Sequence, residues 1–259
     1  MNRTLLISAS GMEAQQVRTD TIANNMANVS TSAFKRGVSN FQDMLYQKMA
    51  APGSDSSTTT LPVGIQLGTG VRTSYVAKDF TQGSLQASSS DLDIAIEGDG
   101  FFPITMPDGS TTYTRAGNFH MDSTGKVVTA EGYAVQGFPT LDTNATSITV
   151  TSDGTVSVYV NGTNSSKGQI QLARVPNPEG MDYIGHNLYR LTDASGTALL
   201  GTAGSNNFGN LAQHYTESSN VEIITEMVDL IAAQRAYELN SKSIKNSDQM
   251  LSLVNNLKM

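Results

Sequence analysis

Apolar residues recur at helical spacing at both ends of the chain, and neither end contains a proline. An apolar face that includes Leu5, Met12 and Ile22 predicts a helix over about residues 3–28. Near the other end, the sequence at 219–222 has the Ser-x-x-Glu spacing of a capping box, and a second helix is predicted over about residues 220–257. This second helix repeats apolar residues every seven positions, at Ile223, Leu230, Tyr237, Ile244 and Leu251.

A seven-residue apolar repeat favours packing against a partner helix. The neighbouring row begins with Met227 but continues with the polar residues Gln234, Ser241 and Asp248. Polar residues in that row weaken an isolated coiled coil. We therefore expect the distal half of this helix to be marginal alone and to become ordered by assembly.

The middle of the chain shows the period of two that is typical of strands. Leu92, Ile94 and Ile96 alternate with shorter or charged residues, and the valines of 156–160 alternate before an Asn-Gly turn at 161–162. No alternation of strands with helices is visible, so the sheets should be antiparallel. The predicted fold class is α+β, with paired terminal helices bracketing a mainly antiparallel β middle domain.

Composition divides the chain further. Residues 50–61 are small and polar, which indicates a linker or extended loop. We predict a discontinuous helical assembly module at 1–49 and 217–259, an extended loop or hairpin at 50–74, and a β-rich outer domain at 75–216. The net charge of -7 and the lack of a basic stripe argue against a nucleic-acid partner.

The residue types needed for catalysis are sparse. There is no cysteine, and His120, His186 and His214 are scattered without ligand spacing. The glycines of 98–100 begin like a dinucleotide fingerprint, but Pro103 occupies the third glycine position and no helix follows. We predict that the protein is not an enzyme and binds neither cofactor nor metal. No apolar run has the length of a signal-peptide core or a membrane span, so membrane insertion is not expected.

Two stretches of the termini resemble the bacterial flagellar rod and hook proteins. They are Ile22–Arg36, which reads IANNMANVSTSAFKR, and Glu226–Lys242, which reads EMVDLIAAQRAYELNSK. Between them, Gln82–Leu85, Asp91–Phe102 and Tyr113–Phe119 match the central β pattern of the family in the same order. The length and the segment 43–71 resemble the distal rod branch. Ala33 departs from the glycine that is usual in the family, and a glycine there allows positive φ.

The resemblance implies a structural subunit that polymerises with itself into a hollow, rigid drive shaft. This shaft encloses the export channel and transmits torque to the hook. The implied partners are proximal rod proteins, hook or hook-junction proteins, P-ring and L-ring proteins, the rod cap and the flagellar type III export apparatus. The implied location is the flagellar basal body, from periplasm to outer membrane, with export that needs no cleaved signal peptide.

Two sets of residues follow from the pattern and the resemblance. The expected assembly interface consists of Leu5, Met12, Ile22, Asn24, Asn25, Met26, Asn28, Phe34, Ile223, Met227, Leu230, Gln234, Arg235, Tyr237, Ile244 and Leu251. The expected rod-stiffening segment contains Tyr46, Pro52, Gly53, Leu61, Pro62, Gly64 and Gly68. Asparagine side chains should end the first helix, Phe34 should anchor the exit segment in an apolar pocket, and Lys35 and Arg36 should remain in water.

Alternatives remain from the same and from other classes. A proximal rod or hook subunit of the same family fits most of the pattern. A secreted β-rich scaffold or adhesin also places helices around a β middle. A carbohydrate-binding or hydrolytic module would need aromatic platforms, and the absence of Trp weighs against it.

Overall fold

The chain folds into two compact units that are not continuous in sequence. The computed structural model describes residues 3–50, 55–56, 59–60, 64–160, 162–205 and 207–256. One unit consists of residues 1–27, 37–77 and 222–259, and the other of residues 28–36 and 78–221. We call them the helical unit and the β unit. The three-part division by function stays a prediction.

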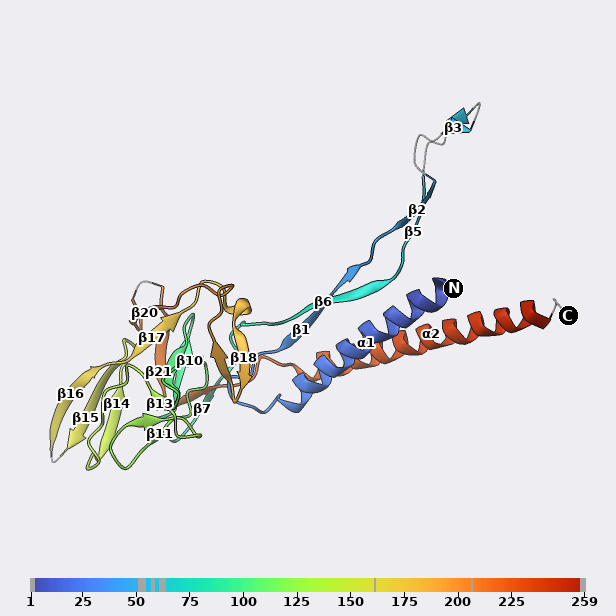
Figure 1. Cartoon of the computed structure of the whole chain (residues 1–259). Coiled ribbons are helices and arrows are strands. Elements are labelled where there is room, and N and C mark those ends of the chain that lie inside the picture. The colour runs from blue at the N-terminus through green and yellow to red at the C-terminus, as the bar shows by residue number, and fades with distance from the viewer. Residues whose placement is uncertain are drawn as a thin grey trace. The chain divides into compact units, whose positions relative to one another are not determined.

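The helical unit contains both terminal helices and a narrow β ribbon. Helices α1 (Arg3–Ala27) and α2 (Ile223–Asn256) lie side by side (Figure 1). The ribbon is built from the pairs β1–β6, β2–β5 and β3–β4, and the last two pairs are antiparallel. Its strands are β1 (Gly37–Asp43), β2 (Gln47–Ala50), β3 (Asp55–Ser56), β4 (Thr59–Thr60), β5 (Ile65–Leu67) and β6 (Val71–Lys78).

The β unit is built around one large sheet. Its strand order is β11-β12-β13-β9-β10-β19-β18, and every pairing in it is antiparallel. These strands are β9 (Phe102–Thr105), β10 (Thr111–Thr114), β11 (His120–Met121), β12 (Val127–Val128), β13 (Ala134–Val135), β18 (Asp182–Gly185) and β19 (Leu188–Arg190).

Smaller sheets complete the β unit. One has the order β14-β15-β16, and the others are the pairs β17–β20, β21–β8 and β22–β7. Their strands are β7 (Leu85–Ala87), β8 (Ile94–Glu97), β14 (Ser147–Val150), β15 (Thr155–Val160), β16 (Thr163–Gln169), β17 (Gln171–Arg174), β20 (Leu199–Thr202), β21 (Asn210–Gln213) and β22 (Tyr215–Glu217). A short 3₁₀ helix, η1 (Pro178–Gly180), precedes β18. The predicted α+β class with an antiparallel β middle is confirmed.

Alternating residues of the predicted strands form the main core. Ile94 and Ile96 of β8 and Val156 and Val158 of β15 are fully buried in one cluster with Phe102. The pattern was wrong at Ala95, which is also buried, since β8 is covered on both faces. The core therefore lies in the β unit, where strands from distant parts of the sequence meet.

The predicted capping box does not form. α2 begins at Ile223, and the Ser219 hydroxyl accepts a hydrogen bond from the Val221 N–H at 3.2 Å. This is a local turn around the chain entering the helix rather than a cap on its first turn.

Within the described residues, no helix is long and apolar enough to cross a membrane.

Candidate functional site

Small and polar residues line the inward face of α1. Ser8, Ala14, Ile22 and Asn25 are its buried residues. A Cβ atom added at Gly11 would lie only 2.8 Å from the Asn240 side-chain nitrogen of α2, so the two helices approach closely there. Of the predicted face, only Ile22 is buried, while Leu5, Met12 and Met26 are half-buried. Sequence periodicity identified the helix but not the face that packs.

The inward face of α2 has the same character. Glu226, Ala233 and Ser247 are buried at intervals of seven, and Asn240 completes the row half-buried. The row of α2 that faces α1 therefore differs from the predicted apolar row and consists of small and polar residues. In the predicted apolar row, Leu230 and Ile244 are half-buried, whereas Ile223, Tyr237 and Leu251 are exposed. Gln234 and Arg235 are also exposed, and Arg235 pairs with Glu238 at 2.9 Å on the same helix.

Five apolar residues on the first turns of α2 are exposed. We call them the α2 ridge: Ile223, Ile224, Met227, Val228 and Ile231, which are 49–73% exposed. Ile224 and the buried Glu226 are two residues apart, about 200° around the helix. Ile224, Val228 and Ile231 therefore lie opposite the face that packs within the subunit, and Ile223 and Met227 lie between the two faces. An apolar stripe with this placement is typical of a surface that a partner covers.

Polar contacts fix the ends of the helix pair within the helical unit. The Asn25 side chain donates to the Gly37 carbonyl at 2.9 Å and accepts from the Gly37 N–H at 2.8 Å, and it also donates to Glu226 at 3.2 Å. Arg18 pairs with Asp229 at 2.9 Å across the two helices. The expectation that an asparagine satisfies backbone groups beyond the helix is confirmed for Asn25.

The segment after α1 carries its backbone strain at Ala33, the position where the sequence departs from the usual glycine. Asn28 accepts hydrogen bonds from the N–H and hydroxyl of Thr31. None of Asn24, Asn25 and Asn28 has positive φ; Ala33 does, with φ of 56°. A left-handed conformation costs a residue with a Cβ about 1–2 kcal/mol. Ala33 is nevertheless held there, because its N–H donates to the Glu217 carbonyl at 2.7 Å.

The predicted stiffening segment is described in part. Tyr46 is exposed, Gly64 is half-buried, and a Cβ on Gly68 would touch the Tyr46 ring at 3.6 Å. Pro52, Gly53, Leu61 and Pro62 lie outside the described residues. The described ribbon also exposes apolar side chains, among them Leu45, Met49 and Ile65. The ribbon therefore offers a second apolar surface in the helical unit.

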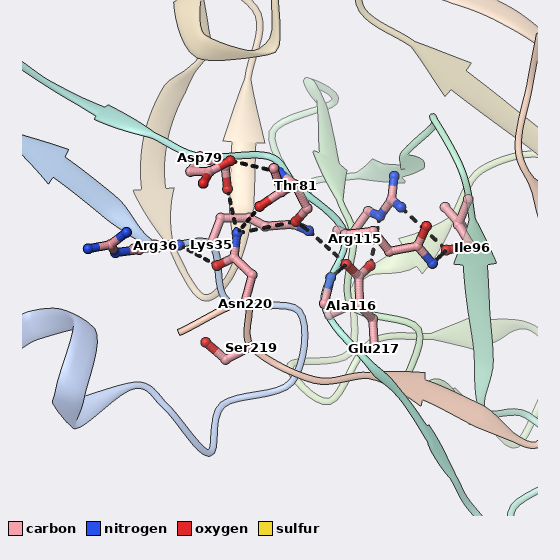
Figure 2. Close-up of polar contacts among 12 residues, drawn as sticks. Lys35, Arg36, Asp79, Thr81, Ile96, Arg115, Ala116, Glu217, Ser219 and Asn220 are labelled. Atoms are coloured by element: carbon pink, nitrogen blue, oxygen red, sulfur yellow. Dashed lines mark hydrogen bonds and ion pairs between the residues drawn. The ribbon is translucent and has the colours of Figure 1, made fainter. Parts of the chain in front are cut away.

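A buried ion cluster lies in the β unit and was missed by sequence reasoning. Glu217 accepts from Lys35 at 2.7 Å and from Arg115 at 2.8 Å, and its side chain is fully buried (Figure 2). The Gly83 N–H donates to the same carboxylate at 2.9 Å. Lys35 was expected in water, but only 1% of its side chain is exposed. That expectation was wrong because the lysine has a buried carboxylate and the Thr81 carbonyl, at 2.7 Å, as partners.

Opposing effects act on the ionisation of this cluster. Burial by itself raises the pKa of Glu217, but the charges of Arg115 and Lys35 and their hydrogen bonds outweigh burial and lower the pKa. Burial lowers the pKa of Lys35 more than its pairing with Glu217 raises it. At neutral pH, Glu217 is therefore an ionised carboxylate held between two basic side chains.

The sequence motifs of the β middle converge on this cluster. Arg115 donates to the main-chain carbonyls of Gly100 at 2.8 Å and Gly98 at 2.6 Å. The stretches that hold Lys35, Gly83, Gly98 and Arg115 are all parts of the family resemblance. Lys35 and Arg115 each lie inside a stretch of the family resemblance, and these two charged residues were the available signal. Their common partner, Glu217, lies outside all of these stretches.

Phe34 and Asn220 both contact the segment 78–81. Phe34 is buried as expected, and the Lys78 ammonium lies 4.0 Å from the centre of its ring. The Asn220 side chain accepts from the Arg36 N–H at 2.7 Å and donates to the Asp79 carbonyl at 2.9 Å and the Thr81 hydroxyl at 3.0 Å (Figure 2).

In the described part of the chain, no group of three or more His, Cys, Asp or Glu side chains could hold a metal ion.

Comparison with known families gives three matches along the chain. The family described as "Flagella basal body rod protein" matches residues 5–35. "Flagellar hook protein FlgE/F/G D1 domain" matches residues 95–158, and "Flagellar basal body rod FlgEFG protein C-terminal" matches residues 212–257. These matches include both terminal helices and part of the β unit.

Full-length relatives are also found. The flagellar basal-body rod protein FlgG of Caulobacter vibrioides is 46% identical over 99% of both chains. FlgG of Borreliella burgdorferi is 45% identical over 100% of this chain and 99% of its own. FlgG of Bacillus subtilis is 39% identical over 100% of both.

Proposed function

The chain belongs to the FlgG family of flagellar basal-body rod proteins, structural subunits of the distal rod, and we propose that it polymerises through its helical unit into a hollow, torque-transmitting shaft. The α2 ridge carries this proposal. An isolated subunit leaves the ridge in water although it packs small and polar residues against α1. A second copy of the chain is the occupant that a self-assembling subunit supplies.

The gain from covering the ridge is large enough to drive assembly. Full burial of an aliphatic side chain stabilises by about 1.5–3 kcal/mol. The five ridge residues are about half exposed, so their burial contributes about 5 kcal/mol per subunit. The small and polar residues that line the contact between α1 and α2 support this proposal, because they leave the large apolar side chains for contacts between subunits.

The remaining expectations form part of the same proposal. Residues 1–49 and 217–259 would form the assembly module, 50–74 would stiffen the shaft and 75–216 would form the outer domain. The partners would be the proximal rod, the hook or its junction, the P and L rings, the rod cap and the export apparatus. The subunit would reach the periplasm without a cleaved signal, and it would perform no catalysis and need no cofactor.

Ridge variants test polymerisation without disturbing the fold of the subunit. Val228→Asp and Ile231→Asp change exposed side chains, so they should leave thermal unfolding of the purified chain unchanged. Both should fail to restore rods in a strain that lacks the wild-type gene. Asn246→Asp adds the same charge to a polar, exposed position of α2 and should restore rods. Normal rods from both ridge variants would overturn the proposed surface.

A deletion in the segment 50–74 tests its proposed stiffening role. Deletion of residues 52–60 should leave the rod able to assemble but make it bend more, as measured on isolated basal bodies by electron microscopy. An unchanged rod shape and stiffness would count against the stiffening role.

A further inference from the structure

The chain passes between the two units at four points, and the structure gathers the adjoining stretches of the β unit. The boundaries fall after residues 27, 36, 77 and 221. Residues 28–36, 78–81 and 217–221 are thus the connecting segments of the β unit. Any force that reaches the β unit through the chain enters by these three segments.

Each connecting segment is tied to the other two by polar contacts, of which the Lys35–Glu217 pair is buried. Lys35 of the first segment binds the Thr81 carbonyl of the second and the Glu217 carboxylate of the third. Asn220 of the third segment binds the Arg36 N–H of the first and the Asp79 carbonyl of the second. The three segments therefore cannot slide past each other without breaking charge-assisted hydrogen bonds.

The ties continue into the sheets of the β unit. Arg115 follows β10 and bonds Glu217 at 2.8 Å, and it also bonds the Gly98 and Gly100 carbonyls between β8 and β9. Its guanidinium is planar and fixes several directions at once. Arg115 thereby joins the third connecting segment to the turn between β8 and β9.

Stability alone does not require this arrangement. Burial of charged groups costs free energy, and well-packed apolar residues often give equal or greater stability than a buried ion pair. Directional hydrogen bonds instead hold each segment in one register, which apolar packing does less well. The arrangement favours fixed geometry over stability.

We propose that Lys35, Arg115, Glu217 and Asn220 form a clamp through which torque passes between the connecting segments and the sheets of the β unit. This inference rests on the proposed function of the chain as a rod subunit. The clamp makes the subunit stiff under torsion, a property separate from its ability to assemble.

The test compares clamp variants with a core variant of the same unit. Glu217→Gln and Asn220→Ala break ties between connecting segments, whereas Leu172→Ala removes a fully buried apolar side chain of the core and no hydrogen-bonding group of the clamp. Each full-length variant is expressed in a strain without its own copy. Thermal unfolding of the purified chains, the number of rods and the torsional stiffness of tethered cells are measured.

The clamp variants should restore rods but lose torsional stiffness. Leu172→Ala should lower thermal stability about as much as Glu217→Gln does and yet keep wild-type stiffness. Stiffness that follows thermal stability across the three variants, or wild-type stiffness of both clamp variants, would overturn the clamp. Failure of both clamp variants to enter rods that Leu172→Ala does enter would also overturn it, because the cluster would then serve folding only. Failure of the wild-type chain itself to restore rods would refute the proposed function instead.

Discussion

Replacement of Glu217 by glutamine should destabilise the protein far more than an equivalent change on the surface. The carboxylate accepts three hydrogen bonds, two of them from the charged side chains of Lys35 and Arg115. Glutamine keeps the shape but has one acceptor oxygen, so its NH₂ group faces a donor and two cations lose their counter-charge. Removal of one partner of a buried ion pair costs about 3–5 kcal/mol, a large share of a typical total stability.

Urea unfolding of the purified chain, followed by far-ultraviolet circular dichroism, measures this loss. Asp182→Asn is the matched control, since its partner Arg190 and Asp182 itself are about half exposed. An exposed pair contributes at most about 1 kcal/mol. Lys35→Met should cost less in the Glu217→Gln background than in the wild type, because the lysine is then an unpaired buried cation. Equal, small losses for Glu217→Gln and Asp182→Asn would show that the buried carboxylate contributes no more than an exposed one.

Three further changes test the β unit. Burial raises the pKa of Glu217, but Arg115 and Lys35 lower it below the ordinary value near 4.5, so the stability that the ionised carboxylate provides should be lost as the pH falls below that value. The thermal midpoint of Glu217→Gln should fall less steeply with pH than that of the wild type. Parallel profiles would contradict the assignment. Ala33→Val should lose about 1–2 kcal/mol in urea unfolding because a branched side chain disfavours positive φ, with Ala33→Gly as the tolerated control. Gly117→Ala should cost about 3 kcal/mol because its Cβ would lie 1.7 Å from the Ile94 carbonyl oxygen. Gly109→Ala, with open space around it, should cost about 1 kcal/mol. Similar losses of stability for these two variants would contradict the close approach at Gly117.

Periodicity predicted the helices and the principal strands because these elements follow from local patterns. The bounds of α1 and the alternation in β15 agree closely with the pattern. It could not predict which face of α2 packs within the subunit. That face uses Ala233 and Ser247, whose burial depends on how closely α1 approaches and not on their own hydrophobicity.

The ion cluster could not be predicted from a single sequence, for a related reason. Lys35 and Glu217 are 182 residues apart, and nothing local marks either as buried. A lysine between Phe34 and an arginine is more often in water. Only the folded chain shows that the carboxylate needed to bury it comes from the last strand before α2.

The location of the protein in the flagellum is the direct test of its assignment as a distal rod subunit. An epitope inserted between Thr143 and Asn144, both exposed in the loop before β14, can be labelled on isolated basal bodies and located by electron microscopy. Label confined to the rod segment between the rings and the hook is the result expected of a distal rod subunit. Label on the hook, or basal bodies without label in cells that express an accessible epitope, would contradict this account.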